Sequence, residues 1–276
     1  MSECMRTVQP FSVLLPVYAG EKSDYLYESL RSITLGTCIP SQVVIVEDGP
    51  LTPALNRVID VYRALLPIHS VRRPRRGLPA ALNAGLLECR HDIVARCDSD
   101  DINLPRRFEL QLQVLRNLPE VGVVGADIRE FDSEGLRCKA RRMPVGDTGL
   151  RRYARTRNPL NHPSVMYRRS VIEGVGGYHD LRGFEDYELW IRCLLGGIRI
   201  VNIPEPLVYV RAGAPLLARR RGWAYARSEL ALAALFRRLG FLDLPGYLFF
   251  VAARVPLRLL PGPALAGIYR RFLRQD

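Results

Sequence analysis

Short apolar runs alternate with amphipathic stretches along roughly the first hundred residues. The runs FSVLLPVY and QVVIVEDG are nearly continuous in aliphatic and β-branched residues, which is typical of strands buried on both faces of a parallel sheet. Between them, Leu26, Leu30 and Ile33 recur at helical spacing. The same alternation predicts strands at 68–73 and 92–100 and helices at 53–66 and 78–89. Repeated β-α units of this length predict a doubly wound α/β sheet with right-handed connections.

The apolar pattern is less regular after residue 103. Segment 120–132 is expected to form a strand that pairs with 136–144 across a turn at Ser133–Gly135. The helix that precedes these strands should begin with Asn103 as its N-cap and Pro105 in its first turn. Its core-facing side chains are expected to be Phe108, Leu112 and Leu115.

A further helix is expected at 184–196, followed by one or two strands within 198–211. It would end at Gly196–Gly197, because paired glycines are a common stop signal. Glu188 and Arg192 are four residues apart and are expected to form an ordinary surface pair. The buried face of the helix would comprise Tyr187, Trp190, Ile191 and Leu194.

The composition changes after about residue 211, which divides the chain into an α/β domain at 1–210 and a helical extension at 211–276. Segment 216–240 is a candidate for a basic amphipathic helix. The apolar tail that follows is interrupted by Pro245, Pro256, Pro261 and Pro263. Its longest apolar stretch falls short of the roughly 20 residues that a membrane-spanning helix needs. Two interpretations stay open: helices that lie on an anionic membrane surface, which the interleaved basic and apolar residues favour, or a cap folded onto the α/β domain.

The chain is basic, with 40 Lys and Arg against 28 Asp and Glu and a net charge of +12. This excess indicates anionic partners such as nucleic acid, a phospholipid surface or phosphorylated substrates, although an arginine-rich genome composition accounts for it equally well. The six cysteines show no C-x-x-C pair and no histidine at zinc spacing, so they are expected to be small buried side chains in a reducing compartment. The first ten residues, MSECMRTVQP, lack the apolar core of a secretory signal, which predicts a cytoplasmic protein.

Three carboxylates occupy four positions in the segment ARCDSDDINLPRR, directly after an apolar strand. Asp98 and Asp100 are two residues apart, so in extended chain both would point to one face. Asp48 closes an earlier strand, and ligands of such sheets bind at the carboxyl ends of the strands. Paired carboxylates suit Mg²⁺ or Mn²⁺, which could bridge a diphosphate. The alternative is an acidic turn in which Asp101 and Asn103 merely cap the next helix.

Six segments carry a resemblance to a known family, in constant order over about residues 11–210: SVLLPVYAGE, QVVIVEDG, RRGLPAALNAGL, ARCDSDDINLPRRFELQ, NHPSVMYRRSVIEGVGGY and GFEDYELWIRCL. Together they resemble the family 2 glycosyltransferases of the GT-A fold, especially those of bacterial exopolysaccharide and lipopolysaccharide biosynthesis. The resemblance implies a Rossmann-like mixed sheet flanked by helices, with a nucleotide-sugar-binding half at about 11–102 and an acceptor half at about 103–210. It also implies a metal-dependent, inverting transfer from a nucleoside-diphosphate sugar, UDP-sugar above all, to a glycan or polyprenyl-diphosphate-linked acceptor. Such an acceptor would account for a location on the inner face of the cell membrane.

The resemblance assigns roles on the donor side. Asp48 would meet the base or ribose, Asp98 the ribose or the metal region, and Asp100 would be the principal metal ligand. The other donor-side residues are Pro16, Val17 and Tyr18, which would border the base, and Arg76 and Gly77, which would cover the nucleotide with Arg76 near its phosphates. Family members often carry asparagine where this chain has Arg75, and here Pro79 follows Gly77-Leu78. Two interpretations of RRPRR therefore stay open: it binds phosphate more strongly than in other family members, or it is simply solvated.

The pair Glu185-Asp186 is the candidate on the acceptor side. Acids at the start of a helix are also favoured by its macrodipole alone, and adjacent helical residues point in different directions, so the two cannot share one role. The family pattern makes Asp186 the general base that deprotonates the acceptor hydroxyl, while Glu185 would orient the acceptor or the base. His162 would lie near the diphosphate or acceptor, or would be a structural hydrogen-bonding residue. The residues alone leave a retaining double displacement open.

Two other classes of protein fit parts of the sequence. A nucleic-acid-binding protein would use the basic clusters RRPRR and ARRRGW, but these are scattered and no known nucleic-acid motif accompanies them. A sugar-phosphate nucleotidyltransferase would need a glycine-rich loop after the first strand, where PVYAGEKSD has a single glycine.

Overall fold

The computed structural model describes residues 9–131, 139–181, 183–211 and 222–259. The expected turn at Ser133–Gly135 and the prolines Pro261 and Pro263 lie outside these residues. Nine strands of the described part form one mixed sheet with the main order β3-β2-β1-β4-β8-β6-β9-β5, and β7 pairs with β6. This is the mixed α/β sheet that the sequence predicts.

The first half of the sheet is parallel and follows the apolar runs closely. Its strands are β1 (Ser12–Val17), β2 (Gln42–Asp48), β3 (Ile68–Arg73) and β4 (Ile93–Arg96). β1 lies between β2 and β4, with Ser12 opposite Gln42 on one side and Val94 on the other. β1, β2 and β4 are fully buried, as expected for strands covered on both faces. Their carboxyl ends therefore meet at one edge of the sheet.

The second half of the sheet is mixed. Its strands are β5 (Ile102–Asn103), β6 (Val121–Phe131), β7 (Lys139–Arg141), β8 (Met166–Arg168) and β9 (Arg199–Arg211). β8 runs antiparallel to both β4 and β6, and β9 runs parallel to β6 with register shifts. β5 pairs with β9, so Ile102 lies opposite Tyr209. This pairing joins the end of the acidic segment to a strand more than a hundred residues later in the chain.

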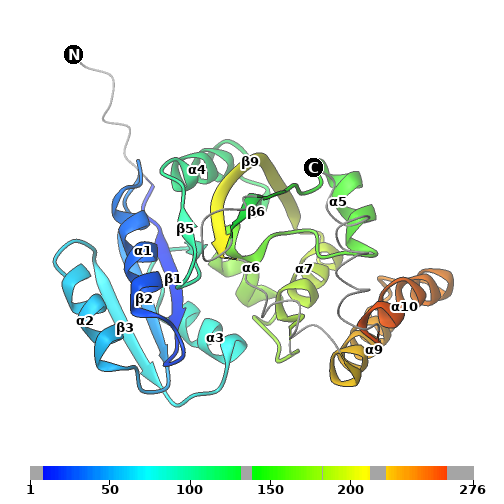
Figure 1. Cartoon of the computed structure of the whole chain (residues 1–276). Helices are drawn as coiled ribbons and strands as arrows, with labels where there is room; N and C mark the ends of the chain where they lie inside the picture. Colours follow the sequence, from blue (N-terminus) through cyan, green and yellow to red (C-terminus); the bar gives the residue numbers. More distant parts are fainter. Residues whose placement is uncertain (1–8, 132–138, 182, 212–221, 260–276) are drawn as a thin grey trace.

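Helices cover both faces of the sheet (Figure 1). They are α1 (Ser23–Thr34), α2 (Pro53–Tyr62), α3 (Leu78–Glu88), α4 (Arg107–Asn117), α5 (Asp147–Ala154), α6 (Arg169–Gly174), α7 (Glu185–Leu195), α9 (Trp223–Arg238) and α10 (Leu244–Leu259), with a 3-10 turn at His162–Ser164. Alternate residues of β1 point to opposite faces, because Val13 belongs to the core beneath α1, α2 and α4, and Leu14 to the core beneath α3 and α7. The structure thus has one hydrophobic core on each side of the sheet.

The sequence-based expectation for the start of α4 is wrong. Asn103 does not cap α4, which begins at Arg107 after Arg106. Asn103 belongs to β5 instead, and its buried side-chain amide donates to the Ser32 hydroxyl at 2.9 Å. The pairing of β5 with β9 competes with helix initiation here, and the N-cap position of α4 lies three residues later, at Arg106.

The pair Glu188–Arg192 is not a surface pair. The Glu188 side chain is 1% exposed and that of Arg192 is 12% exposed, with 2.7 Å between Oε2 and Nη2. The guanidinium of Arg192 also donates to the carbonyls of Val175 and Gly177, and His179 lies 3.1 Å from Glu188. The turn before α7 therefore folds over this pair and buries it, a tertiary effect that i,i+4 spacing does not reveal.

The C-terminal helices α9 and α10 pack against α7. Phe236 of α9 and Phe250 of α10 are fully buried, and their rings lie 5.0 and 6.4 Å from that of Tyr187. The buried carboxylate of Glu229 accepts hydrogen bonds from Arg254 and Arg258. α10 is continuous through Pro256, so the proposed interruption of this segment at that proline is wrong. None of the described helices is long and apolar enough to cross a membrane.

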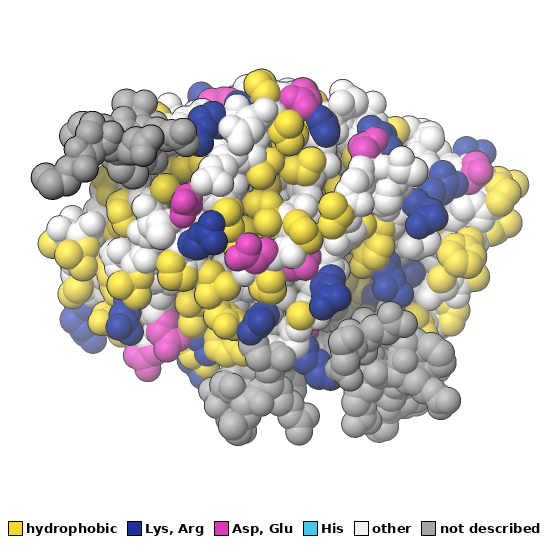
Figure 2. Space-filling model, turned by 90° about the horizontal axis from the view of Figure 1, so that it is seen from above, with side chains coloured by type: hydrophobic (Ala, Val, Ile, Leu, Met, Phe, Trp, Pro, Cys, Tyr) yellow, Lys and Arg dark blue, Asp and Glu magenta, His cyan; other side chains and the backbone are white. Residues whose placement is uncertain are grey.

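The charged side chains are dispersed on the face shown in Figure 2. Basic side chains lie among acidic and hydrophobic ones there, rather than in one continuous strip. A nucleic-acid backbone is normally bound by a continuous basic face. On this face, the described part of the surface does not offer one.

Candidate active site

The carboxyl ends of β1 and β2 form one wall of the candidate site. Asp48, at the end of β2, is nearly buried, and its carboxylate accepts hydrogen bonds from the backbone N–H groups of Arg76 (2.7 Å) and Gly77 (3.0 Å). Gly77 has φ +89°, a left-handed conformation that favours glycine and allows the turn into α3. Asp48 therefore holds the loop at 74–77 in place, and the Arg76 side chain is left exposed.

Tyr18 is exposed at the end of β1, while Pro16 and Val17 are buried within the strand. The guanidinium of Arg75 lies 5.8 Å from the centre of the Tyr18 ring, which is within cation–π range. Tyr18 and the 74–77 loop thus face the same edge of the sheet. The resemblance assigns this edge to the nucleotide, and that assignment stays a prediction.

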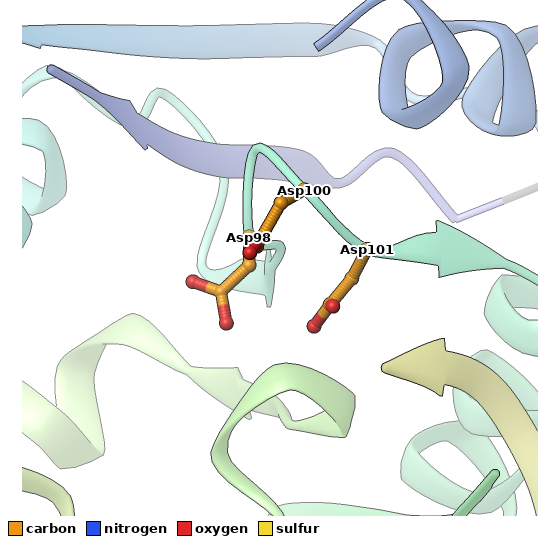
Figure 3. A group of neighbouring side chains, drawn as sticks. All are labelled: Asp98, Asp100 and Asp101. Carbon is orange, nitrogen blue, oxygen red and sulfur yellow. The ribbon is translucent and has the colours of Figure 1, made fainter. Parts of the chain in front are cut away.

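Asp98, Asp100 and Asp101 lie together in the loop that joins β4 to β5 (Figure 3). Each offers a carboxylate oxygen within 4.8 Å of those of the other two. The sequence-based site included Asp98 and Asp100, and the structure adds Asp101 to them. Asp101 does not cap α4, because that helix begins at Arg107.

Two arginines partly offset the repulsion among these carboxylates. Arg96, at the end of β4, is 3% exposed, and both of its terminal nitrogens contact the carboxylate of Asp98. Arg211, at the end of β9, donates its backbone N–H to Asp101 Oδ1 (2.9 Å) and its Nε to the carbonyl of Asp100 (3.2 Å). Bidentate arginine–carboxylate pairs fix geometry as well as charge. The loop is therefore held by a cation from each of two different strands.

Burial and mutual repulsion raise the pKa values of two of these carboxyl groups. Burial, followed by the charges of Asp98 and Glu21, raises the pKa of Asp100 to about 7. Burial and the neighbouring carboxylates raise the pKa of Asp101 well above its usual value. Asp101 Oδ2 is buried and has no hydrogen-bond partner. A hard divalent cation such as Mg²⁺ or Mn²⁺ prefers oxygen ligands, so these carboxylates fit its requirements.

Glu185 and Asp186 occupy the first turn of α7. The side-chain amide of Asn158 donates to Asp186 Oδ2 at 2.6 Å. Burial, followed by the charge of Asp186, raises the pKa of Glu185, and the charge of Arg96 lowers it. Arg96 is therefore within electrostatic range of Glu185 as well as in contact with Asp98. The charge of this one buried arginine therefore acts on both acidic groups of the site.

His162 is buried beneath the same region. Its Nε2 lies 3.2 Å from the Tyr178 hydroxyl, and its ring packs against Trp190. Burial, followed by the charge of Arg96, lowers its pKa well below the usual value. A neutral imidazole in this position offers hydrogen bonds and no positive charge. The structure thus provides His162 with the surroundings of a structural residue.

Sequence reasoning missed four residues of the site: Arg96, Asp101 as a ligand candidate, Asn158 and Arg211. A signal existed for Arg96, because a charged residue inside a buried strand needs a partner or a function. Asn158 and Arg211 carried no such signal, since their partners Asp186 and Asp101 are 28 and 110 residues away in the chain.

Residues 12–176, which include this geometry's donor-side loops, match the model of glycosyl transferase family 2. The chain belongs to glycosyl transferase family 2. The matched residues contain the 74–77 loop and the Asp98–Asp101 loop but end before α7. Membership in this glycosyltransferase family favours sugar transfer over the two alternative classes considered from the sequence.

Family 2 relatives extend over the whole chain. The amylovoran biosynthesis glycosyltransferase AmsE of Erwinia amylovora is 37% identical and covers 95% of this chain and 98% of the relative. A UDP-Gal:alpha-D-GlcNAc-diphosphoundecaprenol beta-1,3-galactosyltransferase of Escherichia coli is 36% identical over 96% of this chain and 97% of its own. The mannosyltransferase PcManGT of Pyrobaculum calidifontis, solved with GDP-Man and Mn²⁺, has a TM-score of 0.63 at 20% identity and covers 96% of this chain and 76% of its own. The last similarity establishes the shared glycosyltransferase fold.

Proposed function

We propose that this chain is an inverting glycosyltransferase that moves a sugar from a UDP-sugar to a lipid-linked saccharide diphosphate in cell-surface polysaccharide biosynthesis. One observation carries the proposal: Arg96 contacts a carboxylate group suited to a cation, Asp98–Asp101, and its charge also acts on Glu185 of a second pair suited to a base, Glu185-Asp186. The names of the two bacterial relatives support polysaccharide biosynthesis, a UDP-linked donor and a diphospholipid acceptor. The titration described below also tests whether another nucleoside diphosphate binds in place of UDP.

The donor binds at the edge formed by β1, β2 and β4 in this proposal. Tyr18 borders the base, the 74–77 loop held by Asp48 covers the nucleotide, and Asp98 stays fixed by Arg96. Asp100 is the principal ligand of a divalent cation, with Asp101 beside it. When bound, the cation neutralises the departing nucleoside diphosphate.

Asp186 acts as the general base. The acceptor hydroxyl attacks the anomeric carbon, the bond from that carbon to the diphosphate oxygen breaks, and the hydroxyl proton passes to the Asp186 carboxylate. Asn158 orients this carboxylate through its amide. Glu185, whose pKa is raised by burial, orients the acceptor. A single displacement of this kind inverts the anomeric centre.

The donor site can be tested by calorimetric titration of UDP, GDP and TDP with Mn²⁺ and with EDTA. We expect metal-dependent binding of UDP to the wild type and its loss in Asp100→Ala. Arg116→Ala, at an exposed position of α4, is the matched control and should bind as the wild type does. Equal binding by Asp100→Ala, or equal binding in EDTA, would overturn the metal site.

The helical extension at 211–276 is the proposed contact with an anionic membrane surface, beside a catalytic domain at 1–210. The exposed positions of α10 are all apolar: Leu244, Pro245, Leu248, Phe249, Ala252, Ala253, Pro256 and Leu259. The exposed charged residues of α9 are all arginines: Arg227, Arg237 and Arg238. Figure 2 shows hydrophobic and basic side chains together at the end of the molecule where α10 lies. An apolar stripe flanked by arginines is the composition of an interfacial helix.

This contact can be tested by flotation with vesicles that contain phosphatidylglycerol. Leu248→Glu with Phe249→Glu should abolish flotation, because both side chains are more than half exposed (56% and 62%) and would be moved from apolar to charged. Leu65→Glu, at an equally exposed position after α2, is the control and should float as the wild type does. If the wild type does not float with the vesicles, the extension is a cap folded onto the α/β domain and does not bind the membrane.

A further inference from the structure

An open cleft of about 530 Å³ runs along α5, outside the groups described so far. One side is formed by the chain before the helix, including Val145, and the other by the helix and its C-terminal end. Its lining residues include Arg152, Tyr153 and Arg157. Gly149 lies in the same lining, where an added Cβ would meet no atom within 4 Å.

The two arginines of the cleft are available for an anion. Arg151 and Arg155, on the same segment, pair with Asp147 and Asp243. Among the described residues, Arg152 and Arg157 have no acidic partner; the guanidinium of Arg157 lies 5.9 Å from the Tyr153 ring. Arginine suits phosphate oxygens because its planar donors can bind two of them at once.

The walls of the cleft are fixed by buried contacts. Asn202 of β9 is buried, and its amide donates to the carbonyls of Pro144 (3.0 Å) and Pro159 (3.1 Å), which flank the cleft in the chain. Arg254 of α10 donates to the carbonyl of Thr156 at 2.9 Å. The cleft is therefore part of the folded framework and is formed before any ligand arrives.

The chain that lines the cleft continues directly to a residue that contacts the proposed base. Asn158, the residue after Arg157, donates to Asp186, and the Tyr187 hydroxyl donates to the carbonyl of Ala154 at 2.7 Å. An anion held by Arg157 would thus lie on the acceptor side of the site. The carboxylates Asp98–Asp101 belong to a different loop and would repel an anion in the absence of a cation.

We propose that Arg152 and Arg157 bind the diphosphate group of the acceptor. This inference rests on the proposed function, since it presumes that Asp186 deprotonates a sugar hydroxyl. The sugar would then bridge from its anomeric diphosphate at the arginines to its hydroxyl at Asp186. α10 contacts Thr156 through Arg254, and Asp243, directly before α10, pairs with Arg155, so the lipid chain would lie next to the apolar stripe.

The test is a calorimetric titration of inorganic pyrophosphate in EDTA, where no cation can recruit it to Asp98–Asp101. The wild type should bind, and Arg152→Ala with Arg157→Ala should weaken binding at least tenfold. Gly149→Trp should weaken it as well by filling the cleft while both charges remain. Arg116→Ala is the matched control and should leave binding unchanged, since it removes an exposed arginine of α4.

Two results would overturn the proposal: no binding of pyrophosphate by the wild type in EDTA, or equal binding by the double variant. Glycerol phosphate represents a phospholipid headgroup, the other possible source of the anion. If glycerol phosphate binds as tightly as pyrophosphate, the cleft does not select a diphosphate, which would also count against the proposal. The double variant should bind UDP with Mn²⁺ as the wild type does. If the wild type does not bind UDP with Mn²⁺, the proposed function is contradicted. Pyrophosphate binding would then still test whether the arginine cleft binds a diphosphate.

Discussion

The two acidic groups of the active site hold their carboxylates in different ways. Asp98, Asp100 and Asp101 are crowded within 4.8 Å of one another, and the pKa of Asp100 is raised to about 7 in spite of Arg96. Asp186 instead accepts a hydrogen bond from Asn158 and lies in the first turn of α7, where the helix macrodipole favours a negative charge. In the proposed mechanism the same residue type would bind a cation in one loop and accept a proton in the other. Neighbours, more than residue type, assign the roles.

The largest effect is expected on the proton-accepting side. Asp186→Asn keeps the shape and the contact with Asn158 but cannot take a proton, so kcat should fall by about 10²–10⁴-fold. UDP binding should be unchanged, because the donor loop is untouched. Steady-state release of UDP with a lipid-linked saccharide acceptor measures the first quantity and calorimetry the second. Near-normal turnover in Asp186→Asn would remove Asp186 from the mechanism.

The next effect concerns Arg96, the buried arginine that contacts Asp98. Arg96→Met should lower the free energy of unfolding by about 2–3 kcal/mol, less than the loss for a fully buried pair, since Asp98 retains 26% exposure. Urea denaturation in EDTA measures it. Adding Asp98→Asn to the Met variant should restore part of the loss, because the unpaired charge is then removed. A double variant as unstable as the sum of both single variants would show that the pair is not coupled.

A smaller effect is expected from pH on the cation side. Below pH 7 a proton on Asp100 competes with the cation, so Mn²⁺ should bind about tenfold more weakly at pH 6 than at pH 8, and affinity should level off above that. Calorimetry in two buffers of different ionisation enthalpy would also detect proton release on binding at pH 6. Constant affinity from pH 6 to pH 8 would mean that Asp100 does not ligate the cation.

The smallest effect is expected at Arg76. Its backbone N–H holds the loop to Asp48, while its side chain is exposed, so Arg76→Ala should preserve the loop. The KM for the donor should rise by roughly two- to fivefold, as for one exposed charge contact. Asp48→Asn is the informative partner, because it disturbs the loop itself and should cost more. A large loss in Arg76→Ala alone would mean that its side chain grips the phosphates directly.

Local patterns predicted most of the parallel half of the fold. The strand expected at 68–73 is observed at Ile68–Arg73, and the helix expected at 78–89 is observed at Leu78–Glu88. The buried stripe of the helix expected at 184–196 is also confirmed, since Tyr187 and Trp190 are both buried. These elements depend on apolar residues at regular spacing within a short window, which is visible in one sequence.

Long-range polar contacts could not be predicted in the same way. Asn103 carries the signal of an N-cap, yet β5 pairs with β9 and takes it into a strand. Glu188 and Arg192 have the spacing of an exposed pair, yet the chain at 175–177 and His179 cover them. Each outcome depends on a segment that is distant in the chain or irregular in pattern.

The sequence by itself determined the order of strands and helices, the placement of Asp48, Asp98 and Asp100 at strand ends, and the resemblance to a family. Apolar periodicity and the residue types at strand ends are local patterns, so they can be recognised in the sequence without knowledge of the fold. Only the tertiary structure decided which groups meet the carboxylates: the guanidinium of Arg96 at Asp98, the backbone N–H of Arg211 at Asp101, and the amide of Asn158 at Asp186. A charge buried without a partner is costly, and the partner comes from wherever the packed chain brings one.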